Sequence, residues 1–477
     1  MRRCITLILA LCCLPLLLLA QLGPKQQTYP KTLTLKTQEF AVLASNAAAP
    51  FAMTAVVGDT VDLGNDGYPG AYALVLTGKD SVRVNYTNVP FDQWVFIPMN
   101  TPRGRATYRL RFNGVAGQFS DEYVRTHMNT TGFAVPEVYE LANILWTLSA
   151  HGKKNSTLPK SGPYYDRVMA HFKPFMAHPV FAAINQITDN FDNYYDFREN
   201  SYTYHFEGDK LAWTGPHYAV WGDVEHTYQA IFHQLLPQIE DFARRSGYRA
   251  FYKKEQPYYQ QLIKQQAEQM PIRKMWDWLE ARFSQRFESY QVVFSPLIGG
   301  SHSTQQFARI MKPGLYKDRV YNEAVMFVDG PEQLLGRSEL TDQQRQGLAS
   351  GVVFTEIDHN YVNPITSRFR KRVDSIFSDR KVWTKVGGDT DSYGTAESVF
   401  NEYMTHALFC LYVRDQYDPQ TAAYVIDRRE KLMVDRRHYY RFREFTQKLT
   451  ELYDARKPDQ SIPAVYPALL NWAKTVR

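Results

Sequence analysis

Two kinds of hydrophobic periodicity divide the chain. Residues 32–37, 72–76, 81–86 and 107–112 alternate apolar and polar positions or form short β-rich runs, as strands do when one face is buried. Turn-forming residues separate these runs, among them Asn113-Gly114, a dipeptide typical of hairpins. We therefore expect a small antiparallel β-sandwich or barrel over residues 21–118. It contains no histidine, which favours an accessory role.

After about residue 119 the apolar positions recur at helical spacing. Pro136 and Glu137 suit the first turn of a helix, and Val138, Leu141 and Leu145 follow on one face. The pattern predicts a large helix-rich domain over residues 119–477 and an α+β protein overall. Further helices are expected over 163–195, 220–250 and 255–290, and short apolar strands over 291–296 and 324–328.

A later helix carries the first set of chemically interesting residues. It should begin near Thr341-Asp342, a favourable N-cap, and end at Asn363-Pro364, because the residue before proline disfavours the helical conformation. Val352, Glu356, His359 and Asn363 are spaced so that they share one face. A carboxylate and an imidazole thus project from a helix face that begins with an apolar residue, which suggests a polar site next to buried apolar side chains.

The next helix repeats this arrangement. Thr395 is the expected N-cap, and the helix should end before Asp418-Pro419. Glu402 and His406 lie one turn apart on a face framed by apolar residues. If the two helices face each other, their carboxylates and imidazoles form a cluster of the kind that binds zinc or another transition metal.

The order of these parts resembles that of the gluzincins, zinc metallopeptidases with an H-E-x-x-H helix and a ligand Glu on a later helix. Residues 355–364, Thr-Glu-Ile-Asp-His-Asn-Tyr-Val-Asn-Pro, also resemble an H-E-x-x-H-x-x-x-N-P motif found in a secreted family of Bacteroidetes proteins. The resemblance covers about residues 120–477, and its specific part is the motif core 291–413. It implies a zincin-like domain, a zinc cofactor and a protein or peptide substrate.

The resemblance assigns roles residue by residue, with one departure. Glu356 matches the general base, His359 the second His ligand and Glu402 the ligand Glu. Thr355 stands where the first ligand His belongs, and threonine is a poor zinc ligand. His406 lies beside Glu402 and is the candidate replacement, which gives a His359–Glu402–His406 metal site.

Other residues complete this hypothesis or have a structural alternative. Tyr393 is expected to stabilise the oxyanion as a second catalytic residue, while Asn363 and His302 are expected to line the site. Thr355 has the alternative of donating a hydrogen bond to a carbonyl one turn back. Asp358 is expected to be a surface charge and Cys410 to lie in the core. His217, His226, His233 and His438 are expected to be structural.

The N-terminal residues predict that the protein is exported. The first residues, Met1-Arg2-Arg3, precede an apolar run over 5–20, which predicts a signal peptide over residues 1–20 cleaved near Ala20. A lipoprotein modified at Cys12 or Cys13 is the minority alternative. Three of the four cysteines lie within the first 13 residues, so the expected mature chain, periplasmic or extracellular, has one thiol and no internal disulfide.

Charge and hydropathy narrow the partners. The formal net charge is +6, and +4 without Arg2 and Arg3. There is no clustered basic stripe, so nucleic-acid binding is not expected. No later segment offers 18 uncharged apolar residues, so the mature chain is expected to have no transmembrane segment.

Two functions from different classes follow. The first is a secreted zinc-dependent peptidase in which metal-activated water attacks the peptide bond and Glu356 accepts its proton. The alternative is a catalytically inactive binding protein of the same fold, for peptides or glycans at the cell surface. The missing first His ligand at Thr355 keeps the second alternative open.

Overall fold

The structure is a computed structural model that describes residues 26–476, except for a set of short segments. These are 29–30, 37–38, 47–48, 57–59, 63–71, 78–79, 86–93, 112–114, 117–120, 214–230, 284, 311–319, 332–338, 388 and 458–459. The expected signal peptide over residues 1–20, with Cys12 and Cys13, lies outside the described residues, as do His217 and His226. The chain is an α+β protein, as expected.

The N-terminal part consists of β-strands arranged in two sheets. Burial alternates along them: Val82 and Val84 are buried while Arg83 is exposed, because neighbouring side chains of a strand point to opposite faces. One sheet has the order β4-β3-β6-β7 and the other β1-β8-β9-β5, with β2 also on β8. The strands are β1 (Gln26–Thr28), β2 (Leu33–Thr34), β3 (Glu39–Asn46), β4 (Ala49–Val56), β5 (Thr60–Asp62), β6 (Tyr72–Leu76), β7 (Ser81–Asn85), β8 (Trp94–Thr101) and β9 (Gly104–Arg111).

The expectation of purely antiparallel pairing was wrong for the second of these sheets. The first sheet is antiparallel throughout, and β8 pairs antiparallel with β9. However, β1 and β2 run parallel to β8, and β5 runs parallel to β9. Alternation of apolar and polar residues shows which face of a strand is buried, but it contains no information about strand direction when the partners are distant in sequence.

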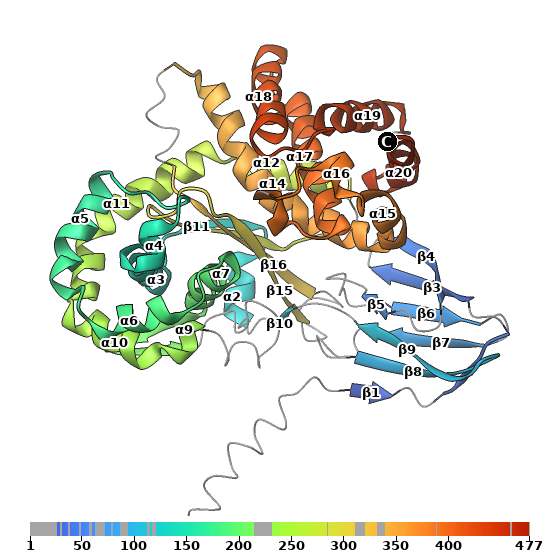
Figure 1. Cartoon of the computed structure of the whole chain (residues 1–477), viewed down its shortest axis with the longest axis horizontal. Helices are drawn as coiled ribbons and strands as arrows, with labels where there is room; N and C mark the ends of the chain where they lie inside the picture. Colours follow the sequence, from blue (N-terminus) through green and yellow to red (C-terminus); the bar gives the residue numbers. More distant parts are fainter. Residues whose placement is uncertain are drawn as a thin grey trace, which may run out of the picture.

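A third sheet, with five strands, lies at the centre of the helical part (Figure 1). Its order is β10-β15-β16-β14-β11, with β15 antiparallel to β16 and the other pairs parallel. β10 precedes the expected boundary at residue 118, yet it pairs with β15. The strands are β10 (Val115–Ala116), β11 (Thr130–Ala134), β14 (Ser289–Ser295), β15 (Ser303–Ile310) and β16 (Val320–Asp329).

Helices flank this sheet in two groups (Figure 1). The expected helical stretch over 163–195 contains three α-helices: Pro174 and Pro179 lie at the junction of the first two, and Asn190 caps the start of the third. The first group, mostly green in Figure 1, comprises α2 (Asp121–His127), α3 (Glu137–Leu148), α4 (Ala150–Lys154), α5 (Pro163–Phe172), η2 (Lys173–Phe175), α6 (Pro179–Gln186), α7 (Phe191–Asn200), η3 (Ser201–Thr203), α9 (Ile231–Gln234), α10 (Leu236–Arg245) and α11 (Tyr248–Gln269), with a hairpin of β12 (Tyr204–Glu207) and β13 (Lys210–Trp213). The next helix, α12 (Ile272–Glu280), packs against the second group instead.

The second group, orange to red in Figure 1, contains the two helices that the sequence singled out. It comprises α14 (Asp342–Arg368), α15 (Arg370–Phe377), α16 (Arg380–Trp383), η4 (Asp389–Ser392), α17 (Ala396–Gln416), α18 (Pro419–Lys431), η5 (Leu432–Arg436), α19 (Phe442–Ala455), η6 (Ile462–Val465) and α20 (Tyr466–Thr475). Among the described residues, no helix combines the length and the apolar character that a membrane crossing requires.

The ends of α14 and α17 test the expected helix boundaries. Thr341 and Thr395 are N-caps with complete capping boxes, and α17 ends before Asp418, all as expected. The expected end of α14 at Asn363-Pro364 was wrong, because the helix continues through Pro364 to Arg368. The two residues after the proline, Ile365 and Thr366, are buried, and their packing offsets the backbone hydrogen bond that proline cannot donate.

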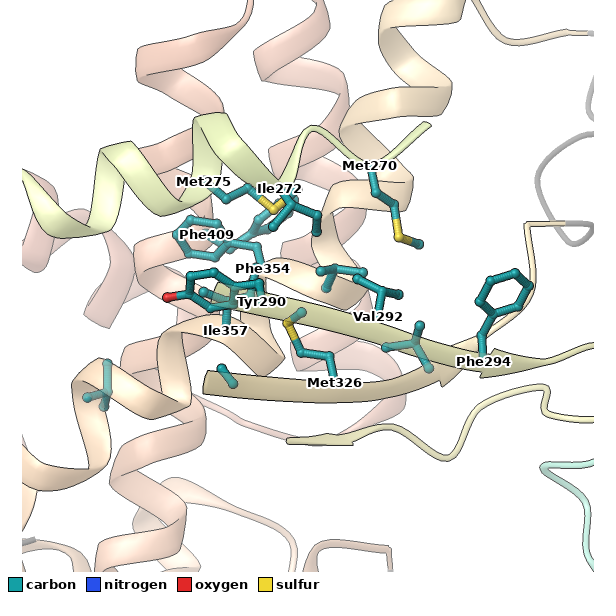
Figure 2. Close-up of a cluster of buried hydrophobic side chains, with 14 of the residues drawn as sticks. Met270, Ile272, Met275, Tyr290, Val292, Phe294, Met326, Phe354, Ile357 and Phe409 are labelled. Carbon is teal, nitrogen blue, oxygen red and sulfur yellow. The ribbon is translucent and has the colours of Figure 1, made fainter. Parts of the chain in front are cut away.

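The core that fixes α14 lies between the helices and one face of the sheet. Figure 2 shows side chains of α14 and α17 packed against those of β14 and β16, with the start of α12 above them. These residues are buried, and they hold the α14 backbone rigidly beneath its polar face. The labelled residues are Met270, Ile272, Met275, Tyr290, Val292, Phe294, Met326, Phe354, Ile357 and Phe409.

Candidate functional site

The polar faces of α14 and α17 meet around one carboxylate. Nε2 of His359 lies 3.3 Å from Oε1 of Glu402. Nε2 of His406 lies 3.4 Å from Oε2 of the same group. Both imidazoles thus lie within ion-pair distance of the same carboxylate. The structure thus brings together the residues that the sequence proposed as metal ligands.

A fourth residue, Arg437, lies against two members of this set. Its guanidinium is 2.8 Å from Oε2 of Glu402 through Nη2 and 2.6 Å from Nε2 of His406 through Nη1. Each nitrogen of the guanidinium edge therefore faces a group that would otherwise be a metal ligand. The guanidinium also stacks on the ring of Tyr393 at 5.3 Å. A permanent cation is thus placed where a bound metal ion would contact Glu402 and His406.

A second arginine occupies the other side of His406. Nη1 of Arg429 is 2.9 Å from Nδ1 of His406, and its guanidinium lies over the Phe409 ring at 4.6 Å. Burial, reinforced by the two nearby guanidinium charges and only partly offset by Glu402, lowers the pKa of His406 to about 3. The ring is therefore neutral and has a single acceptor nitrogen, so it can accept from only one of its two arginine neighbours.

The protonation of His359 and Glu402 follows from the same contacts. Burial opposes the charge on His359, but its hydrogen bond to Glu402 and the carboxylate charge raise its pKa to about 10. Its other nitrogen, Nδ1, donates to Oδ1 of Asn363 at 3.1 Å. Burial alone would raise the pKa of Glu402, yet Arg437 and the two histidines hold it well below its ordinary value. The pair is therefore an imidazolium and a carboxylate.

The described arrangement does not fit a zinc site. Oε2 of Glu402 and Nε2 of His406 face Arg437, and Nε2 of His359 carries a proton that it donates to Glu402. Zinc requires free lone pairs at these atoms, and it is repelled by adjacent guanidinium groups. In the part of the chain that the structure describes, no group of three or more His, Cys, Asp or Glu side chains is arranged to hold a metal ion.

Thr355 adopts its structural alternative. Its hydroxyl donates to the carbonyl oxygens of Gly351 at 3.1 Å and Val352 at 3.0 Å. This is the usual behaviour of a threonine inside a helix. Thr355 therefore does not take over the role of the ligand histidine that the family motif has at this position.

Glu356 is the acidic group of the site without an ion pair or hydrogen bond among the described residues. It is partly exposed. Burial raises its pKa, and the nearby positive charges of His359 and His302 oppose this. Tyr393 lies against Arg437, whose guanidinium is 5.3 Å from its ring centre. The charge of Glu402, then burial and the charge of Glu356 raise the pKa of Tyr393. Glu356 is thus a carboxyl group that is available to an incoming ligand.

His302 lies immediately before β15 and is braced from two sides. Its Nε2 is 3.4 Å from Oδ1 of Asp329, and its backbone carbonyl accepts a hydrogen bond from Tyr195 at 3.2 Å. The preceding carbonyl, of Ser301, accepts from the fully buried Arg198 at 3.0 Å. The loop that carries His302 is thus fixed by contacts with Asp329, Tyr195 and Arg198.

Asp358 corrects a sequence-based expectation. It is fully buried rather than a surface charge, because it lies one turn from Phe354 and Val362 on the inner face of α14. Both carboxyl oxygens lack a hydrogen-bond partner among the described residues, and burial raises its pKa well above the ordinary value. Burial therefore favours the protonated, neutral form of Asp358. Cys410 is buried in the core, as expected.

The arginines are the functional residues that the sequence reasoning missed, although a pattern pointed to them. Val425, Arg429, Met433 and Arg437 recur every four residues. Val425 and Met433 are buried. Two arginines on an apolar helical face require buried counter-charges or acceptors, and Glu402 and His406 supply them.

Comparison of the chain with family models, curated proteins and solved structures found no match.

Proposed function

We propose that the protein is a peptide-binding protein that does not use a metal. The observation that supports this most strongly is the position of Arg437, whose guanidinium contacts Glu402 at 2.8 Å and His406 at 2.6 Å. The proposal corresponds to the second of the two functions drawn from the sequence. In this binding protein, the two facing helices form a polar binding surface. The positive charge of Arg437 takes the place of the charge that a zinc ion would provide.

A peptide suits the groups that remain available. Glu356 can accept hydrogen bonds from peptide N–H groups, while Arg437 and Tyr393 can donate to peptide carbonyl oxygens. A pocket of about 410 Å³ opens beside the loop that carries His302. Its walls include Leu158, Pro163 and Ile298. Such a pocket, with mixed apolar and polar walls, can hold a side chain of the ligand.

The test measures binding and metal content on the same purified protein. A pool of synthetic tripeptides is titrated by calorimetry into the protein, prepared without chelators, and zinc is measured by elemental analysis. We expect saturable peptide binding with zinc at background. Glu356→Ala should abolish this binding, whereas Glu444→Ala, a change at an exposed glutamate on α19, should leave it unchanged.

Three results contradict the proposal. Hydrolysis of the peptides together with stoichiometric zinc would establish the peptidase function instead. Binding of oligosaccharides without binding of tripeptides would move the ligand class to glycans. Absence of tripeptide binding in a folded, monodisperse sample would reject the assignment of the site to peptides.

A further inference from the structure

The pocket beside the His302 loop lies at the carboxyl ends of parallel strands. β11 and β16 both run parallel to β14, which lies between them. Pro296 directly follows β14 and Gly330 directly follows β16, and both residues line the pocket. In open α/β sheets, ligands usually bind at the carboxyl ends of the strands, because the loops that follow the strands meet there. The topology therefore places this pocket where a ligand is expected.

The opposite wall of the pocket is the segment 156–165, which leads from α4 into α5. Two hydrogen bonds join this segment to the loop after β14. The backbone N–H of Gly299 donates to the carbonyl oxygen of Thr157 at 2.9 Å, and the hydroxyls of Thr157 and Ser301 are 2.5 Å apart. The two walls are thus fixed relative to each other, as in a pocket that is formed before its ligand binds.

The described residues that line this pocket include no charged side chain. Lys160, the one charged residue of the segment 156–165, donates to the carbonyl oxygen of Gly152 instead. Tyr164, which lines the pocket, donates to Glu140 at 2.7 Å, and burial raises the pKa of Glu140 to about 8, which favours its neutral form at pH 7. A charged ligand group would therefore lose its hydration here without gaining a counter-charge.

Among uncharged groups, the walls favour an aromatic ring. Leu158 and Ile298 are buried, while Tyr165 is partly exposed. Three proline rings complete the apolar surface, those of Pro159, Pro163 and Pro296. An aromatic side chain buries a large apolar area and packs well in offset or edge-to-face contact with another ring, such as that of Tyr165. The described lining contains no carboxylate or amide side chain that would bind the hydroxyls of a sugar.

The pocket is connected to the polar site through one ion pair. Asp329, the residue before Gly330, lies 3.4 Å from Nε2 of His302. Burial lowers the pKa of His302, but the charges of Asp329 and then Glu356 raise it above its ordinary value. The charge of Glu356 thus acts on the pair that joins the two loops of the pocket wall.

From these features we infer that the pocket is a specificity pocket for an aromatic side chain of the bound peptide. The inference rests on the proposed peptide-binding function and adds the class of peptide that the protein selects. Leu158, Ile298 and Tyr165 contact the ring, and the uncharged lining discriminates against lysine, arginine, aspartate and glutamate side chains. Transfer of the ring from water into the pocket should favour phenylalanine over alanine by about 10- to 100-fold in Kd.

The test compares tripeptides that differ at one position. Calorimetry measures the Kd of Ala-Ala-Ala and of its derivatives with phenylalanine, lysine or glutamate at the first, second or third position. We expect one position at which phenylalanine lowers the Kd by about 10- to 100-fold, while lysine and glutamate do not lower it. N-acetylphenylalanine amide, which presents the side chain without the peptide, should compete with the phenylalanine derivative.

Two substitutions at the pocket test where the ring binds. Ser161→Trp places a bulky side chain at an exposed position of the rim and should remove the gain in affinity from phenylalanine. Tyr165→Leu keeps an apolar side chain but loses the ring, so it should reduce this gain by about 2- to 10-fold. Ser378→Trp and Tyr440→Leu make the same changes at exposed residues that do not line the pocket, and they should leave the gain unchanged.

The outcomes separate this inference from the proposed function. Equal Kd values for all tripeptides, or tightest binding of a lysine or glutamate derivative, overturn the inference and leave peptide binding intact. A preference for phenylalanine that persists in folded Ser161→Trp also overturns it, because the ring then binds elsewhere. Binding of the neutral trisaccharide maltotriose that Ser161→Trp abolishes would assign the pocket to sugars instead. Failure of every tripeptide to bind the folded wild type overturns both the inference and the proposed function.

Discussion

Glu402→Gln is the substitution whose effect on stability follows most directly from the cluster. Glutamine keeps the shape of the side chain and one acceptor oxygen, but it removes the charge that Arg437 contacts at 2.8 Å and His359 at 3.3 Å. Glu402 is nearly fully buried. The variant therefore leaves two cations in the protein interior without their only ion-pair partner among the described residues.

The magnitude can be worked from these distances. For charge centres about 4 Å apart, an effective dielectric constant of about 20 gives an attraction of about 4 kcal/mol. Breaking one side of a buried ion pair typically costs about 3–5 kcal/mol. The side chain of Arg437 is 26% exposed, so water recovers part of this cost. We expect the free energy of unfolding to fall by about 2–4 kcal/mol in the variant.

The pH dependence adds a second signature. The raised pKa of His359 contributes stability below its ordinary value of 6.5, and this contribution is lost as the pH rises through about 10. The lowered pKa of Glu402 contributes stability above its ordinary value of 4.5, and this is lost as the pH falls. The difference between wild type and Glu402→Gln should therefore be largest between pH 4.5 and 6.5 and shrink toward pH 10.

Urea unfolding in metal-free buffer, followed by circular dichroism at several pH values, measures this difference. Glu444→Gln removes one partner of an exposed pair with Arg441, and it should change stability by less than about 0.5 kcal/mol. A Glu402→Gln variant as stable as the wild type, or more stable, would refute the reasoning. It would mean that Glu402 is an unpaired, strained ligand in the metal-free protein.

Two further substitutions test other parts of the structure. Burial raises the pKa of Glu140, which accepts a hydrogen bond from Tyr164 at 2.7 Å, to about 8. In the unfolded chain Glu140 ionises at its ordinary pKa of 4.5, whereas in the folded protein it stays protonated up to about pH 8. The free energy of unfolding therefore falls as the pH rises between these two values, by about 5 kcal/mol at most. Glu140→Gln should remove this slope in urea unfolding, and parallel curves would contradict the assignment. A Cβ at Gly351 would lie 1.9 Å from Nη2 of Arg429, so Gly351→Ala should lower stability by about 1–2 kcal/mol despite alanine's better helix propensity; thermal unfolding that shows stabilisation would mean that Arg429 moves freely.

Local patterns predicted the elements that contain the site. The spacing of Glu356 and His359 on one helix, and of Glu402 and His406 on the next, identified two polar faces, and the structure brings His359, Glu402 and His406 together. Thr341 and Thr395 cap these helices as expected. These predictions depend only on helical periodicity and capping chemistry, which a single sequence contains.

The predictions that failed depend on tertiary contacts. Pro364 ends a helix in isolation, but here the burial of the following turn maintains it. A charged side chain such as that of Asp358 usually lies at the surface, yet Asp358 is buried on the inner face of α14. The role of Arg437 depends on a π-helical turn that places it over Glu402. A local pattern places Arg437 on an apolar helical face, but no local rule gives its position relative to Glu402, because the packing of α17 and α18 against α14 determines it.

The central claim is that an arginine, rather than a metal ion, neutralises the Glu402 carboxylate. Elemental analysis of the unaltered protein, incubated with Zn²⁺ and separated from free metal by gel filtration, tests it most directly. The account predicts zinc at background, with the same result for His406→Ala. Stoichiometric zinc in the wild type that disappears in His406→Ala would contradict it.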